Sequence, residues 1–264
     1  MGQLIERLER TTRGYAKPFG FGAAAKREKI PPMLLLGAVA LGSDADARKA
    51  AEAGLDGAVV AAKGAGKKAD AEKSAKALKE QTWGLWLDEP QKEAPGETDF
   101  QVFSSDGTPI AVLGGEGRTA FMQVNPDLDD SLLRTIDDLP VDGFLVSLAD
   151  ASALTVRQLM RIARVRGVTS KWLLVHVTQP PSQDELGRLR DAGVNAVVVD
   201  VAGHGAEALK ACREALLELP KKEDKRKNGA VATLPPMRQA ASPSRRTAEP
   251  EPDDDDDGGG DLPL

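Results

Sequence analysis

The polar residues best suited to chemistry lie within or directly after short apolar runs. Asp88, His176 and Asp200 occupy such positions. A histidine can shuttle a proton near neutral pH, and a neighbouring carboxylate can orient its ring. His176, or His204 as an alternative, would move the proton, while Asp88 or Asp200 would orient the imidazole. We predict Asp88, His176 and Asp200 as the catalytic set.

His176 and Asp200 also have a purely structural interpretation. His176 stands between Val175 and Val177, so it faces either the interior of a barrel or the surrounding helices, where packing histidines are common. Asp200 interrupts the run V-V-V-D-V, and a carboxylate in a buried strand needs a partner because desolvating a lone charge is very costly. A salt bridge, or a cap on the turn at 203–205, would satisfy Asp200. The sequence leaves both interpretations open.

Further polar residues at the ends of predicted strands could bind a substrate. We predict this role for Gln123 and Asn125, and for the turn formed by Gly203, His204 and Gly205. That turn precedes a helix, whose N-terminal N–H groups could hold an anion. The strand ends together carry Ser43, Asp44, Lys63, Asp88, Glu89, Ser104, Ser105, Gln123, Asn125, Ser147, Asp150, His176, Thr178, Gln179, Asp200 and His204.

Motifs for metals and cofactors are missing from the sequence. There are two histidines and one cysteine, without H-x-H, H-E-x-x-H or C-x-x-C spacing. Neither a G-x-S-x-G turn nor a G-x-x-x-x-G-K-[ST] loop occurs. We predict no metal ligands, although carboxylate-only Mg²⁺ sites have no such spacing and stay open. The sequence identifies no cofactor.

The segment 171–219 contains one complete strand–helix–strand unit. Residues 172–177 form a short apolar run rich in β-branched residues. Ser182 and Glu185 have the spacing of a capping box at the start of a helix, and Gly193 suits the helix end. Residues 196–201 form a second apolar run, as expected of a parallel strand that is buried on both faces.

Earlier parts of the chain repeat this unit. A-E-A-G-L-D-G-A-V-V at 51–60 matches R-D-A-G-V-N-A-V-V-V at 190–199. Only segment 104–118 breaks the pattern, because four glycines and a proline disfavour a helix; we expect an extra strand of a hairpin at 110–113. The predicted strands are 33–40, 56–61, 83–87, 100–103, 120–124, 143–148, 172–177 and 196–201.

Eight strands with mostly helical crossovers predict an α/β fold, a (β/α)8 TIM-type barrel whose fourth βα unit is degenerate. In such a barrel the active site lies at the C-terminal ends of the strands, where the predicted site residues stand. An open, doubly wound sheet is the alternative. No G-x-G-x-x-G follows the first strand, which argues against a dinucleotide-binding fold.

The motif D-A-G-V-N-A-V-V-V at 191–199 resembles the corresponding turn of ribulose-phosphate-binding barrels, and the resemblance covers mainly residues 172–215. It implies a phosphate held by glycine-rich loops after strands seven and eight. The eighth loop, A-G-H-G at 202–205, retains two glycines. The seventh loop is T-Q-P-P at 178–181, and its two prolines remove two N–H donors where the family needs them.

Composition excludes several classes of protein. A net charge of −6 gives no basic field for nucleic acid, and 4% aromatic residues give few surfaces for base stacking. The longest apolar stretch, 33–41, is far shorter than the roughly 20 residues of a membrane span. The single cysteine, Cys212, cannot form an internal disulfide. We expect a cytoplasmic protein without a membrane span or nucleic-acid partner.

The composition also predicts three regions. Residues 1–30 contain a short amphipathic helix at 3–13 and a segment at 14–22 that covers the bottom of the barrel or, alternatively, docks on a partner or a membrane surface. Residues 31–220 form the barrel. Residues 221–264 form a charge-segregated tail, with eight basic and two acidic residues up to position 246 and eight acidic residues after it. We expect this tail to be disordered and to act either as an interaction element that binds a protein partner or as a solubility element.

Deleting residues 221–264 should leave the melting temperature of the barrel nearly unchanged. The tail has too few large apolar residues to offset its chain entropy, so it should not pack on the barrel. It should instead change the salt dependence of self-association or of partner binding. Thermal unfolding and light scattering of the two chain lengths would measure this; a large drop in melting temperature would contradict the predicted boundary.

Two functions of different class fit these features. One is a lyase or isomerase that acts on a small metabolite, with or without a phosphate. The other is a barrel that has lost catalysis and serves as a binding or scaffolding module. The sparse chemistry at the strand ends, the broken fourth unit and the prolines of the seventh loop favour the binding module.

Overall fold

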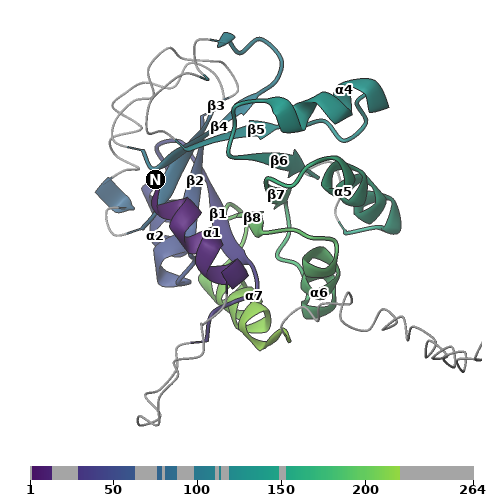
Figure 1. The fold of residues 1–264 in the computed structure, drawn as a ribbon. Coiled ribbons are helices and arrows are strands. Elements are labelled where there is room, and N and C mark those ends of the chain that lie inside the picture. Colours follow the sequence, from purple (N-terminus) through teal and green to yellow (C-terminus); the bar gives the residue numbers. More distant parts are fainter. Residues whose placement is uncertain are drawn as a thin grey trace, which may run out of the picture. The chain divides into compact units, whose positions relative to one another are not determined.

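A computed structural model of the chain describes residues 2–13, 29–62, 76–78, 81–87, 98–110, 113, 119–148 and 153–220. Eight strands form one closed barrel in which β1 pairs with β8 and every neighbouring pair is parallel (Figure 1). The strands are Leu34–Ala40 (β1), Gly57–Ala62 (β2), Trp83–Leu87 (β3), Phe100–Ser104 (β4), Thr119–Gln123 (β5), Gly143–Ser147 (β6), Trp172–Val177 (β7) and Ala196–Asp200 (β8). The predicted (β/α)8 barrel is confirmed, and the open sheet is not formed.

Apart from the N-terminal helix, the helices pack around the outside of the strands (Figure 1). Their bounds are Gln3–Arg13 (α1), Asp44–Glu52 (α2), Asp130–Thr135 (α4), Val156–Val168 (α5), Gln183–Asp191 (α6) and Ala206–Glu218 (α7), with a 3-10 turn (η2) at Ile136–Asp138. The predicted capping box at Ser182 and Glu185 is present, and Thr155 with Gln158 forms another at the start of α5. These caps satisfy N–H groups that would otherwise lack partners at a helix start.

The connection between β4 and β5 differs from the prediction in one respect. Ile110 and Leu113, the described ends of the predicted extra strand, lie in 3-10 turns and not in a strand. β4 and β5 pair directly with each other, from Phe100 opposite Thr119 to Ser104 opposite Gln123. A closed barrel leaves no free edge on which a further strand could pair. The Ile110 side chain is accordingly exposed.

Side chains inside the barrel change character from one end to the other. Deep in the barrel they are apolar and buried, and they form one cluster that includes Leu34, Leu36, Val59, Phe100, Val102, Phe121, Leu145, Leu174 and Val198. Alternation along the strands then places Gln123, Ser147, His176 and Asp200 on the same inner face, one position from the C-terminal strand ends or at them. The polar layer of the barrel therefore lies at its C-terminal mouth.

Helix α1 closes the opposite end of the barrel. Leu4, Ile5 and Leu8 are buried and belong to the interior cluster. Arg7 Nη1 donates a hydrogen bond to the carbonyl of Asp56, directly before β2, at 2.6 Å. The N–H of Gln3 donates to Asp99 Oδ1, directly before β4, at 3.1 Å. α1 thus spans the N-terminal strand ends and seals the apolar core from water.

Replacing Leu8 by alanine should lower the free energy of unfolding by about 2–5 kcal/mol, because the deletion leaves a cavity between α1 and the barrel core. Leu8 is fully buried. Chemical denaturation would measure the loss. Arg10→Ala, on the exposed side of the same helix, is the control and should change stability by no more than about 0.5 kcal/mol. Equal denaturation midpoints for both variants would show that α1 does not stabilise the barrel.

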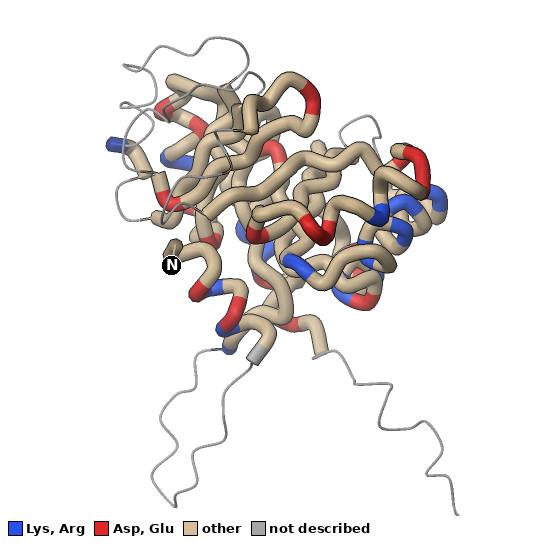
Figure 2. Tube along the Cα trace, turned by 45° about the horizontal axis from the view of Figure 1, so that its top comes forward, with Lys and Arg blue, Asp and Glu red and all other residues tan. Residues whose placement is uncertain are grey.

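Positions of Lys and Arg and of Asp and Glu are interspersed along the described chain (Figure 2). Two arginines of α5 pair with aspartates near α4: Arg161 with Asp127 at 2.6 Å, and Arg164 with Asp130 at 2.6 Å. No helix in the described part of the chain is long and apolar enough to cross a membrane. The segments predicted to bind partners, at 14–22 and 221–264, lie outside the described residues, so their roles stay predictions.

Candidate functional site

His176 lies at the centre of the polar layer, between residues of both neighbouring strands. Its Nδ1 is 3.0 Å from the hydroxyl oxygen of Ser147 on β6, and its Nε2 is 2.9 Å from Oδ1 of Asp200 on β8. A carboxylate can only accept, so Nε2 of neutral His176 carries the proton and donates it to Asp200. Nδ1 then accepts the hydroxyl proton of Ser147. The structure thus joins the predicted pair and adds Ser147.

Accessibility differs sharply along this relay of Ser147, His176 and Asp200. The His176 side chain is 8% exposed and both of its ring nitrogens are occupied, whereas the Asp200 side chain is 36% exposed. Among the described residues, no partner donates a hydrogen bond to the second oxygen of Asp200, Oδ2. Asp200 is therefore more accessible than His176, and its Oδ2 keeps the capacity to accept a further hydrogen bond.

Trp86 extends this network across the barrel. It lies on β3, four strands from β7, yet its ring meets the His176 ring edge to face, with centroids 4.9 Å apart at 90°. The indole nitrogen donates to Oε1 of Gln123 on β5 at 3.1 Å. Trp86 is 9% exposed and belongs to the interior cluster. The indole ring therefore separates the apolar core from the polar mouth.

The remaining predicted residues lie apart from this network. Nε2 of His204 donates to the carbonyl of Thr178 at 2.8 Å and so ties the loop after β8 to the loop after β7. Gly203 has a φ of 83°, which explains a glycine in this turn. Asn125 is exposed, and its Oδ1 accepts the N–H of Asp127 at 3.0 Å. Asp88 lies outside the described residues, so its predicted role remains a prediction.

Gly205 has a structural place as well: it precedes α7 as the N-cap residue, where no side chain closes the helix. Space around it is open, since an added Cβ would meet no atom within 4 Å. The same is true of Gly203. No close contact with another part of the protein therefore requires a glycine at either position. The role of both glycines in substrate binding stays a prediction.

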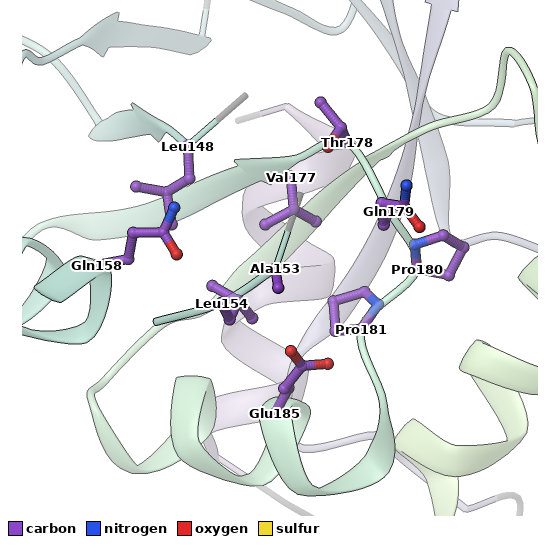
Figure 3. A pocket seen from close by; sticks show the side chains of 10 residues that line it. All are labelled: Leu148, Ala153, Leu154, Gln158, Val177, Thr178, Gln179, Pro180, Pro181 and Glu185. Atoms are coloured by element: carbon purple, nitrogen blue, oxygen red, sulfur yellow. The ribbon is translucent and has the colours of Figure 1, made fainter. Parts of the chain in front are cut away.

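A pocket of about 150 Å³ lies behind β6 and β7, on the side that faces the helices (Figure 3). Leu148 and Val177 face it, while their neighbours Ser147 and His176 point into the barrel. None of the residues predicted as site residues lines it. Its lining is Leu148, Ala153, Leu154, Gln158, Val177, Thr178, Gln179, Pro180, Pro181 and Glu185.

This pocket does not suit a phosphate. One first-turn N–H group of each helix beside it is already used, since Thr155 Oγ1 accepts from the N–H of Gln158 and Ser182 Oγ from that of Glu185. An anion would bind at the helix start, and the Glu185 carboxylate there adds a negative charge that repels it. Together with Pro180 and Pro181, these contacts explain physically why the seventh loop departs from the phosphate-binding pattern.

Other chemistry is limited in the part of the chain that the structure describes. No group of three His, Cys, Asp or Glu side chains there is arranged to hold a metal ion. Burial, with a contribution from Glu185, raises the pKa of the Cys212 thiol to about 11. Cys212 therefore stays protonated at neutral pH, and a thiol is a poor nucleophile. The relay and the Trp86–Gln123 pair are the main polar features of the barrel interior.

No profile of a known protein family matches the sequence, and no curated protein matches it. Solved structures do match. (S)-3-O-geranylgeranylglyceryl phosphate synthase from Thermoplasma acidophilum, solved with its substrate sn-glycerol-1-phosphate, is 13% identical with a TM-score of 0.56 over 83% of this chain and 100% of that one. Thiamine phosphate pyrophosphorylase from Pyrococcus furiosus is 13% identical with a TM-score of 0.51 over 69% and 95%. A 3-hexulose-6-phosphate synthase is 14% identical with a TM-score of 0.51 over 70% and 98%.

At this level of identity the matches show the fold alone. The fold is a closed (β/α)8 barrel of the type to which these enzymes belong. The resemblance predicted from residues 172–215 is therefore confirmed at the level of the fold. Two members of the network were harder to find in the sequence: Ser147 was only one of many strand-end residues, and Trp86 has the pattern of an ordinary core aromatic.

Proposed function

We propose that this barrel is an enzyme of the lyase or isomerase type, which binds a small metabolite at its C-terminal mouth and uses Asp200 for proton transfer. The hydrogen bond from buried His176 to the accessible Asp200 carboxylate, at 2.9 Å, carries the proposal. A catalytic carboxylate must be held in one orientation and must still reach the ligand. Asp200 meets both requirements.

The chain's residues suggest a simple proton cycle. Oδ2 of Asp200 takes a proton from the carbon next to a ligand carbonyl, and the C–H electron pair forms a C=C bond. The carbonyl π electrons move to its oxygen, giving an enolate. In an isomerase the proton of the α-hydroxyl group moves to the former carbonyl oxygen, and the carboxylic acid returns its proton to the former carbonyl carbon, which becomes C–H. In a lyase the Asp200 carboxylate instead takes the proton of a β-hydroxyl group, whose O–H electron pair forms the C=O bond of the leaving aldehyde as the C–C bond breaks; the C–C electron pair gives the enolate, and protonated Asp200 returns the proton to its carbon. His176 holds Oδ1 throughout, and Ser147 keeps the ring in the required tautomer.

The structural matches bear on the kind of metabolite. The synthase from Thermoplasma acidophilum binds sn-glycerol-1-phosphate, and the other two enzymes have phosphate esters in their names. Phosphorylated compounds are therefore reasonable first ligands. Because the loop after β7 lacks donors, a phosphate would have to lie near the turn of Gly203 and Gly205, beside the open start of α7.

Exchange of carbon-bound protons tests the proposal. Dihydroxyacetone phosphate and dihydroxyacetone, incubated with the protein in D₂O, should lose the proton signal of the carbon beside the carbonyl faster than without protein. Proton NMR measures the rate. Asp200→Asn should abolish the protein-dependent exchange. Exchange that persists unchanged in this variant would refute the role of Asp200.

A non-catalytic binding module is the second candidate, and one observation favours it. Both nitrogens of His176 are satisfied within the protein and the ring is buried, as in a histidine whose role is packing. Such a module would bind ligands at the mouth without exchange, and Asp200→Asn would alter affinity alone. The exchange measurement therefore separates the two functions.

A further inference from the structure

We propose that Trp86 is a positioning residue that makes Gln123 a hydrogen-bond donor to the ligand, so that the mouth selects ligands with an acceptor oxygen such as a carbonyl. This inference rests on the proposed function in one respect, namely that the ligand binds at the mouth. It adds a selecting group on β5, across the barrel from Asp200 on β8.

The orientation of the Gln123 amide follows from its partner. An indole nitrogen can only donate, so the atom of Gln123 at 3.1 Å from Trp86 Nε1 must be the oxygen. Rotating the amide by half a turn would set two donors against each other. The amide NH₂ group of Gln123 therefore points away from Trp86. In the described part of the chain nothing accepts from this NH₂, and the Gln123 side chain is half-buried at the mouth.

Trp86 is itself held in place. Its ring crosses the barrel interior to contact His176 edge to face, and it packs in the interior cluster with 9% exposure. An edge-to-face pair has a preferred geometry, because the positive ring edge meets the negative ring face. Turning the indole would break this contact and the hydrogen bond to Gln123 together. Trp86 thus fixes the Gln123 amide as firmly as His176 fixes Asp200.

The mouth consequently presents one fixed donor and one fixed acceptor. The donor is the Gln123 amide NH₂, and the acceptor is Oδ2 of Asp200. A carbonyl compound with an acidic C–H matches both groups. Its oxygen gains negative charge as the proton leaves, so a donor placed there stabilises the charge that develops. A ligand group that can only donate, such as an ammonium, would oppose the Gln123 amide.

Paired probes test the selection without requiring turnover. Dihydroxyacetone phosphate and 3-hydroxypropyl phosphate differ at the central carbon, which carries a carbonyl in one and only hydrogen atoms in the other, so that the second compound lacks the acceptor oxygen. Dihydroxyacetone and 1,3-propanediol form the same pair without phosphate. Dissociation constants would be measured by calorimetry or ligand-observed NMR. The wild-type protein should prefer the carbonyl member of at least one pair by about tenfold, the effect of one well-placed hydrogen bond.

Two variants should remove this preference. Gln123→Met deletes the amide with little change in length, and Trp86→Phe keeps an aromatic ring but lacks the N–H that orients the amide. Both should bring the two members of a pair to within about twofold of each other. Trp172→Phe is the matched control, because Trp172 lies at the far end of β7 and should keep the preference. Gln123→Met alone suffices if Trp86→Phe fails to fold.

The outcomes also separate this inference from the proposed function. A carbonyl preference that is lost in Gln123→Met supports the inference, whether or not deuterium exchange occurs. Exchange in the wild type without a carbonyl preference, or a preference that survives in Gln123→Met, would overturn it while leaving the role of Asp200 intact. Failure of all four probes to bind the wild-type protein would also overturn it.

Discussion

Asp200→Asn should reduce protein-dependent deuterium exchange by about 10²- to 10⁴-fold, the usual contribution of a positioned acid or base. Asparagine has nearly the same shape, and its side-chain oxygen can still accept from His176 Nε2, which lies 2.9 Å from the aspartate oxygen. It cannot take a proton at its amide. The folded structure and ligand affinity should therefore change little while exchange is lost.

Two further variants make this result specific. Asp184→Asn removes an exposed aspartate of α6 and should leave exchange unchanged. His176→Gln should lower the rate less than Asp200→Asn does, because the carboxylate remains but loses the ring that holds its orientation. Exchange at the wild-type rate in Asp200→Asn would mean that another group moves the proton. Loss of folding in His176→Gln alone would indicate a mainly structural histidine.

Asp56→Ala should destabilise the barrel by about 3–5 kcal/mol, the cost of removing one partner from a buried ion pair. Asp56 precedes β2, and its side chain is 11% exposed. Oδ2 accepts the N–H of Leu35 at 2.9 Å, and Oδ1 accepts from Arg213 Nη2 on α7 at 3.2 Å. The variant leaves both donors without their acceptor. Urea denaturation would measure the loss; a change below about 0.5 kcal/mol would show that water replaces the carboxylate at no cost.

The contribution of Asp56 to the free energy of unfolding changes with pH in a defined direction. Burial raises the pKa of Asp56, and this outweighs the hydrogen bond from Leu35 and the charges of Arg213 and Arg7, which lower it. A raised pKa means that the folded protein binds this proton more tightly than the unfolded chain. The resulting stability is fully present below the unfolded pKa of about 3.9 and is lost as pH rises through the folded value.

Comparison with Asp56→Asn isolates this effect. The stability of the wild type relative to Asp56→Asn should fall as pH rises from about 3.9 through the raised pKa. Urea denaturation of both proteins at a series of pH values measures this difference. A relative stability that increases with pH would show that the ion pair with Arg213 outweighs the burial of the carboxylate.

Local sequence determined the elements of the barrel. Strands β3 and β7 begin and end as predicted, at Trp83–Leu87 and Trp172–Val177, because short β-branched or aromatic runs bounded by polar residues favour buried strands. Ser182 with Glu185 marked a helix start for a similarly local reason. The repeat of the strand–helix unit then predicted the closed barrel, and the barrel placed His176 and Asp200 at one end.

Tertiary structure alone decided how distant side chains meet. Trp86 reaches His176 from the strand opposite, and Arg213 pairs with Asp56 across 157 positions of sequence. The described ends of the predicted strand at 110–113, Ile110 and Leu113, lie in 3-10 turns, and β4 and β5 pair directly with each other. Such contacts depend on the closure of the barrel and on the register of its strands, which all eight strands set together. A local sequence pattern therefore does not predict these contacts. The sequence therefore named His176 and Asp200 as candidate site residues, and the folded barrel determined how they lie, with the His176 ring buried and the Asp200 carboxylate partly exposed.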